Sequence, residues 1–323
     1  MSRMDAVFSF YYYFCRILIY KKPMKTEEKV AGELAAASKA GAVRQVIVDI
    51  VLFTVLTFVL LFLFTIPFML VFPQLASEGS GRNIYFLMLN EGVMLAGVLF
   101  AAWLVLTIRH RPLSSLGLSL QGCWKSLLKG AVFVAGLYLV GFGVSLLSGV
   151  IEVADVAFSP VSLLLSLLFF FLVAITEELM VRGFILGRML DGGINKFAAL
   201  FMSSVIFSLL HVLNPDFAFV PFLNIVLAGF FLGASYVYTR NLCFPIALHW
   251  FWNWIQGPVL GYKVSGNELG GESLLTLRLP EENLINGGAF GFEGSLLCSG
   301  LLVLGTALII GYYNRHASDK LGR

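Results

Sequence analysis

The chain has 323 residues, of which 59% are hydrophobic and 13% are charged, and its formal net charge is +3. A soluble domain is typically about 45–50% apolar and about 25% charged, so this composition excludes an ordinary soluble globule. The small net charge gives no indication of nucleic-acid binding, and we expect the lipid bilayer to be the main surrounding partner.

The first 46 residues carry eight Lys and Arg residues, which predicts a cytoplasmic N-terminal segment by the positive-inside rule. Within it, the aromatic stretch "FSFYYYFCRILIY" at 8–20 is not followed by a small-residue cleavage site. We therefore expect this stretch to be retained and to lie in the membrane interface.

Hydropathy predicts eight transmembrane helices, because the apolar stretches approach or exceed the roughly 18 residues that cross a bilayer. Basic residues fall in alternate connections, so both termini are expected in the cytoplasm. The fold class is therefore an all-α polytopic membrane protein, and we expect it to reside in a bacterial cytoplasmic membrane. The predicted spans are 47–73, 84–107, 126–149, 161–187, 197–213, 217–238, 242–260 and 295–313.

The connection at 261–294 is rich in Gly, Asn and Glu, and its polarity excludes it from the bilayer core. It is expected to be a long external loop. The cysteines show neither a CxxC motif nor metal-type spacing, so we expect packing residues or unpaired thiols rather than a metal site. They are Cys15, Cys123, Cys243 and Cys298.

Charged residues interrupt the fourth predicted span at "ITEELMVRGF", 175–184. Charges at membrane depth are costly and usually mark a functional site. Glu178 and Arg182 are four residues apart, which places them on one helix face within ion-pairing distance. Glu177 lies about 100° around the helix from Glu178, without that partner, and is the better candidate for a reactive base.

Two further predicted spans carry polar residues at helical spacing. His249 and Asn253 project from one face of the seventh span, and Phe207 and His211 repeat the same interval on the fifth. Depths along the three helices are compatible with one shared cavity near the membrane midplane.

A carboxylate, two imidazoles and an amide suit amide hydrolysis. A carboxylate in a low-dielectric cavity can accept and return a proton and so activate water. Asn253 and a histidine can donate hydrogen bonds to the oxyanion that forms on the attacked carbonyl. In a second mechanism, Glu177, His211 and His249 would bind a divalent metal such as zinc and leave a coordination position open. The sequence is compatible with either mechanism.

The three motifs Glu-Glu-x-x-x-Arg, Phe-x-x-x-His and His-x-x-x-Asn, at 177–182, 207–211 and 249–253, resemble those of the CPBP family. That family comprises CAAX prenyl endopeptidases and bacteriocin-processing or Abi-type proteins, often described as intramembrane metalloproteases. The resemblance covers roughly 160–260, about a third of the chain.

The resemblance implies that Glu177 is the general base and that His211 positions or activates the water. It also implies that His249 and Asn253 stabilise the oxyanion while Glu178 and Arg182 form a supporting ion pair. The implied function is cleavage of a membrane-associated peptide or protein substrate, prenylated or peptide-like, by a glutamate-type or a metal-dependent mechanism. The corresponding organisation is a segment 1–46, accessory helices 47–160, a core 161–260, the loop 261–294, and a last helix with its tail, 295–323.

Other interpretations of the same residues remain open. The buried ion pair could fix helix register alone, and His249 and Asn253 could join helices through hydrogen bonds. At the level of function, the alternatives are a non-proteolytic immunity or scaffold protein and a proton-coupled transporter that uses Glu and His as relays.

Overall fold

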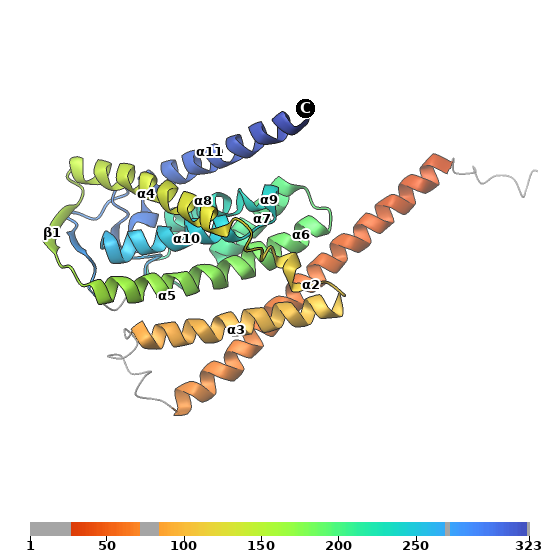
Figure 1. Ribbon diagram of the computed structural model, residues 1–323, viewed down its shortest axis with the longest axis horizontal. Coiled ribbons are helices and arrows are strands. Elements are labelled where there is room, and N and C mark those ends of the chain that lie inside the picture. The colour runs from red at the N-terminus through yellow and green to blue at the C-terminus, as the bar shows by residue number, and fades with distance from the viewer. Residues whose placement is uncertain (1–26, 72–83, 269–271, 322–323) are drawn as a thin grey trace, which may run out of the picture. The chain divides into compact units, whose positions relative to one another are not determined.

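The computed structural model describes residues 27–71, 84–268 and 272–321, and these form a polytopic all-α protein with one short pair of strands (Figure 1). The chain divides into two units, Met1–Gln45 and Val46–Arg323. The contacts and the site described below belong to the second unit. The predicted interfacial stretch at 8–20 lies outside the described residues.

Among the described residues, six helices are long and apolar enough to cross a membrane. They correspond to six of the eight predicted spans. The six helices are α2 (Glu27–Val71), α3 (Ile84–Ile108), α4 (Cys123–Leu147), α5 (Pro160–Glu178) with its helical continuation to Asp191, α8 (Phe219–Gly233) with its continuation to Thr239, and α11 (Leu296–Leu321).

The other two predicted spans form shorter helices. The span at 197–213 becomes α7 (Lys196–Leu209), which begins where the Asn195 side chain accepts hydrogen bonds from the first backbone N–H groups. The span at 242–260 becomes α10 (Cys243–Trp254), followed by the π-helical turn η4 (Ile255–Val259). Both were predicted to be longer α-helices than the structure contains, because hydropathy does not detect a turn that is itself apolar.

Two helical segments continue as π-helix next to the predicted site residues. α5 runs without a break into the π-helix η3 (Leu179–Leu186) and then α6 (Gly187–Asp191), while η4 follows α10. π-helical turns are rare and are frequent at functional sites. Here they begin directly after Glu178 and two residues after Asn253.

Close helix packing brings the helices that carry the motifs together. α4 packs against α10, α7 against α8, and α5 against both α3 and α10. Small residues permit this, because a Cβ added at Gly130 of α4 would lie 2.5 Å from the Cβ of Ala247 in α10. α10 is thereby held between α4 and α5.

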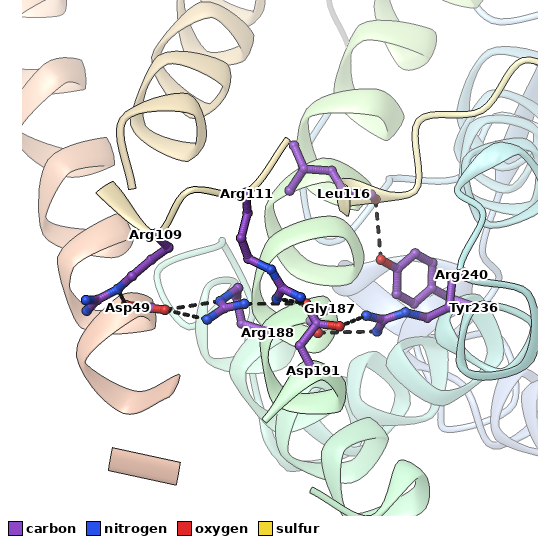
Figure 2. Close-up of polar contacts among 9 residues, drawn as sticks. All are labelled: Asp49, Arg109, Arg111, Leu116, Gly187, Arg188, Asp191, Tyr236 and Arg240. Atoms are coloured by element: carbon purple, nitrogen blue, oxygen red, sulfur yellow. Dashed lines mark hydrogen bonds and ion pairs between the residues drawn. The ribbon is translucent and has the colours of Figure 1, made fainter. Parts of the chain in front are cut away.

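Four arginines and two aspartates form an ion network at one end of the helices (Figure 2). Asp49 of α2 accepts hydrogen bonds from Arg109 Nε and Arg188 Nη2, each at 2.6 Å. Asp191, at the end of α6, pairs with Arg111, Arg188 and Arg240. Three connections that were each predicted to be cytoplasmic supply these arginines, so the structure brings those three connections to the same end of the protein.

A disulfide between Cys123 and Cys243 corrects the prediction of packing residues or unpaired thiols for these two cysteines. It joins the first residues of α4 and α10 across 120 positions of sequence. Neither residue has a neighbouring cysteine, so no local spacing could indicate the pair. Cys298 is a buried free thiol, and Cys15 lies outside the described residues.

The predicted external loop, 261–294, is tightly connected to the helices. Its strand β2 (Leu275–Arg278) pairs antiparallel with β1 (Glu152–Val156), and two short 3-10 turns follow, η5 (Gly288–Phe290) and η6 (Phe292–Gly294). The carboxylate of Glu293 accepts hydrogen bonds from Ser265 N at 2.6 Å and Trp252 Nε1 at 3.2 Å. The loop is therefore anchored to α10.

Candidate active site

The buried centre of the site is the Glu178 carboxylate. Its side chain is fully buried, and Oε1 accepts from Arg182 Nη1 at 2.7 Å and from His249 Nδ1 at 2.9 Å. The ion pair predicted from the i, i+4 spacing is thus present. Burying a carboxylate is favourable only when charge partners and hydrogen bonds offset its lost hydration, and Glu178 has two such partners.

Arg182 connects this pair to two more elements. Its Nη2 donates to the carbonyl oxygen of Gly229 in α8 at 3.2 Å, and its guanidinium carbon lies 4.4 Å from the centre of the Phe207 ring of α7. A guanidinium over an aromatic face is attracted by the ring quadrupole. The arginine therefore joins η3, α7 and α8 behind the site.

Glu177 lies in a different environment from its neighbour. Its side chain is 21% exposed, whereas that of Glu178 is 0% exposed. Within the described part of the chain, Glu177 Oε2 has no hydrogen-bond partner, and the nearest cationic atom is His249 Nε2 at 3.8 Å. Glu177 is therefore the carboxylate that is free to bind a water molecule or a substrate group.

The hydrogen bond to Glu178 fixes the orientation of His249. Because an ionised carboxylate can only accept, Nδ1 carries the hydrogen in this contact, and Nε2 is directed towards Glu177. The ring also packs edge-on to Phe207, with ring centres 6.0 Å apart. His249 thus presents one nitrogen to the site and uses the other for support.

His211 lies in the turn that follows α7. Its Nδ1 donates to the backbone carbonyl of Phe207 at 2.8 Å, so Nε2 is the nitrogen left for other contacts. The ring lies 4.8 Å from that of Phe207. Phe207 therefore contacts one charged or polar residue from each of the three motifs.

A cavity of about 560 Å³ connects these residues. Its lining includes all four predicted catalytic residues, Glu177, His211, His249 and Asn253, while Glu178 and Arg182 lie behind it. Much of the remaining wall of the cavity is apolar and comes from α2, α3, α5 and α7. Residues of the long loop between Val264 and Glu268 form another part of the wall. The structure thus brings the four residues to one cavity, and their catalytic roles remain predictions.

One further acidic residue lies in a transmembrane helix next to α5 and was not among the predicted site residues. Glu91 of α3 stands alone in the apolar run "YFLMLNEGVMLAGV", and α3 packs against α5, the helix that carries Glu177. The signal was available, because an isolated carboxylate in a transmembrane span is a functional candidate by default. It lacks a partner at helical spacing, and it was overlooked for that reason.

The three predicted metal ligands do not form a tight ligand cluster in the described part of the chain. Among the described residues there is no group of three or more His, Cys, Asp or Glu side chains placed to hold a metal ion. Glu177, His211 and His249 line one cavity, and each histidine has Nδ1 engaged in a hydrogen bond and Nε2 left for other contacts. Metal-binding histidines have this arrangement too, so the choice between a glutamate-type and a metal-dependent mechanism stays a prediction.

Comparison with known protein families gives one match that covers this site. Residues 159–255 are similar to the Rce1-like family of type II CAAX prenyl endopeptidases. The matched segment begins at Ser159, the residue that caps α5, and includes all three motifs. Searches of curated proteins and of solved structures returned no match.

Proposed function

We propose, on the premise that this chain belongs through residues 159–255 to the Rce1-like CAAX prenyl endopeptidase family, that it cleaves a membrane-associated substrate with a water activated by Glu177. The observation that carries this proposal is the shared cavity, in which a half-buried carboxylate faces an imidazole that is itself held by a second carboxylate. This is the arrangement of a general base with a positioned partner.

In the proposed reaction, Glu177 removes a proton from water while the water oxygen forms a bond to the carbonyl carbon of the scissile peptide. The carbonyl π electrons move to oxygen, and the resulting oxyanion accepts hydrogen bonds from the Asn253 amide and His249 Nε2–H. Protonated Glu177 then returns its proton to the peptide nitrogen as the C–N bond breaks. His211 Nε2 accepts a hydrogen bond from the attacking water and orients it.

His249 can donate from Nε2 only as an imidazolium, because its Nδ1–H is directed to Glu178. Glu178 on one side and Glu177 on the other provide negative charge that stabilises this form. In the proposed mechanism, the ion pair of Glu178 and Arg182 therefore supports catalysis, because Glu178 determines which nitrogen of His249 faces the substrate.

The cavity walls support a substrate that is partly apolar and associated with the membrane. Residues from α2 and α3 contribute Phe58, Leu61, Leu87 and Met94 to the lining. These surfaces suit a hydrophobic segment or a lipid-modified peptide, while the polar residues lie around Glu177. We propose a prenylated or hydrophobic peptide as the first substrate class to examine.

The central test compares wild-type protein with Glu177→Gln in proteoliposomes that contain a quenched fluorescent farnesylated peptide. We expect the wild-type protein to cleave the peptide and the variant to lose at least about a hundredfold in kcat, because the base is absent. Glu152→Gln, on the exposed strand β1, serves as the matched control and keeps full activity. A Glu177→Gln variant that is folded and cleaves at the wild-type rate would remove Glu177 from the mechanism.

A further inference from the structure

A tight turn of the long loop, at 264–267, forms part of the cavity wall, and the proposed mechanism gives it no role. Val264 and Asn267 exchange two backbone hydrogen bonds, of 3.0 and 2.9 Å, across Ser265 and Gly266. The two central residues have φ angles of 48° and 80°, as in a two-residue hairpin turn. Val264, Ser265 and Asn267 line the same cavity as Glu177.

Ser265 has a left-handed backbone that other contacts must hold in place, because this conformation is unfavourable for a residue with a side chain. The Glu293 carboxylate supplies two of these contacts. Its Oε2 accepts from the backbone N–H of Ser265 at 2.6 Å and from the Ser265 hydroxyl at 2.8 Å. The Ser265 carbonyl accepts from Asn214 Nδ2 at 2.9 Å. Contacts from two separate segments therefore hold the turn in one conformation.

Glu293 also contacts the helix that carries the proposed oxyanion donors. Its Oε1 accepts from Trp252 Nε1 at 3.2 Å, and Trp252 directly precedes Asn253 on α10. Glu293 is itself 7% exposed and lines the cavity. These donors to Glu293 are uncharged, and burying a carboxylate among neutral groups costs free energy. A carboxylate accepts stronger hydrogen bonds than an amide, so it holds the turn more firmly than an amide would.

The 264–267 turn packs directly on the segment that carries His211. A Cβ added at Gly266 would lie 2.1 Å from the carbonyl oxygen of Pro215, so the two backbones are in close contact. Asn214, whose side chain holds the turn, donates its backbone N–H to the His211 carbonyl at 2.9 Å. The turn is thus fixed against two of the segments that carry the motifs, α10 and the residues that follow α7.

We infer that Glu293 is a positioning residue that fixes the 264–267 turn as a rigid wall of the substrate cavity, and that this wall limits the size of the substrate group beside it. A rigid wall excludes large groups, because the turn cannot move without breaking its hydrogen bonds to Glu293. The inference rests on the proposed function for its effect on selectivity, whereas the rigidity of the turn can be measured without any activity. The family match ends at residue 255, so Glu293 and the turn lie outside it.

Hydrogen–deuterium exchange of the whole protein in lipid nanodiscs tests the rigidity of the turn. Glu293→Leu cannot accept a hydrogen bond, so we expect the backbone amides of 264–267 to exchange about tenfold faster or more than in wild type. Glu293→Gln keeps one acceptor oxygen for Ser265, and we expect it to restore most of the protection. Glu281→Gln, at an exposed position of the same loop, is the control. Equal exchange in folded Glu293→Leu and wild type would overturn the inference, whether or not the protein cleaves peptides.

Asn214→Ala examines the same turn without changing the buried acid. It removes the donor to the Ser265 carbonyl and leaves the contact between Glu293 and α10 in place. We therefore expect faster exchange of the 264–267 amides with little change in thermal unfolding. If Glu293→Leu does not fold, this variant decides the question, and unchanged exchange in Asn214→Ala would then overturn the inference.

Substrate selectivity tests the role of the wall in catalysis. Quenched fluorescent farnesylated peptides carry alanine, leucine or tryptophan at each position around the scissile bond in turn. At one position at least, we expect wild-type kcat/KM to fall about tenfold or more from alanine to tryptophan, and we expect Glu293→Leu to reduce this ratio to about threefold or less. Glu293→Gln should return the ratio towards the wild-type value.

The outcomes separate the inference from the proposed function. A residue that only stabilised the fold would lower the cleavage of all peptides alike, so an unchanged ratio in Glu293→Leu would overturn the role in selectivity. A wild-type protein that cleaves every peptide in the series equally well would overturn it too. A wild-type protein that cleaves none of the peptides would contradict the proposed function, and the exchange measurement would still decide whether Glu293 fixes the turn.

Discussion

Two adjacent glutamates in α5 have opposite environments, and one residue of helical rotation explains the difference. Side chains at successive positions diverge by about 100°, so Glu178 faces Arg182 and His249 while Glu177 faces the cavity. One carboxylate oxygen of Glu178 accepts hydrogen bonds from both Arg182 and His249. Among the described residues, one carboxylate oxygen of Glu177 has no hydrogen-bond partner. The same residue type therefore serves as support at one position and as the proposed base at the next.

Substitution of Arg182 tests whether the ion pair with Glu178 stabilises the protein. We expect Arg182→Met to lower the free energy of unfolding by about 3–5 kcal/mol, because it leaves the buried Glu178 carboxylate without its cation. Thermal unfolding in detergent measures this effect. The double variant Glu178→Gln/Arg182→Met removes the charge together with its partner, and we expect it to be more stable than Arg182→Met alone. An Arg182→Met variant as stable as wild type would show that the ion pair makes no measurable contribution to the free energy of unfolding.

Among the elements, α10 is the helix that completes the site, and small residues hold it in place. Gly130 of α4 lies against Ala247, two positions before His249, and the Cys123–Cys243 disulfide joins the first residues of the same two helices. The indole N–H groups of Trp250 and Trp254 donate to backbone carbonyls of α5. These contacts fix α10 between α4 and α5. The orientation of the His249 side chain towards the cavity therefore depends on helix packing.

Substitution of Gly130 tests this dependence of the site on helix packing. We expect Gly130→Leu to displace α10, to cost about 1–3 kcal/mol of stability and to reduce peptide cleavage, because the added atoms overlap Ala247. Gly136→Leu on the same helix is the matched control, since no atom lies within 4 Å of a Cβ added there. Unchanged cleavage by Gly130→Leu would mean that the position of α10 does not determine activity.

At the scale of the whole molecule, the ion network of Figure 2 joins α2 with three connections that lie between residues 109 and 240. Asp191 alone has three arginine partners, Arg111, Arg188 and Arg240. Several cations that share one carboxylate repel one another once its charge is removed. The network therefore stabilises the arrangement of three connections that are remote in sequence.

Asp191→Asn tests the network. We expect the free energy of unfolding to fall by about 1–3 kcal/mol, since partly exposed ion pairs contribute little each but three converge here. The difference from wild type should shrink as sodium chloride is added, because salt screens the exposed arginines. Asp155→Asn, on the exposed strand β1, is the control. A salt-independent loss would indicate that Asp191 acts through packing rather than charge.

Helical periodicity predicted well where the interacting residues are close in sequence. The ion pair of Glu178 and Arg182 was predictable because four residues of α-helix bring two side chains to one face. The Cys123–Cys243 disulfide was not found, since its two cysteines lie on different helices. The lengths of α7 and α10 were overestimated because apolar turns have the same hydropathy as apolar helices.

The sequence by itself determined a polytopic helical membrane protein with three polar motifs that resemble those of CAAX proteases, because bilayer thickness and helix pitch act on local runs of residues. Tertiary structure alone decided that Glu177, His211, His249 and Asn253 line one cavity, that Glu178 orients His249, and that the long loop closes part of the wall. These relations depend on how separate helices pack, and packing is set by side chains far apart in the chain.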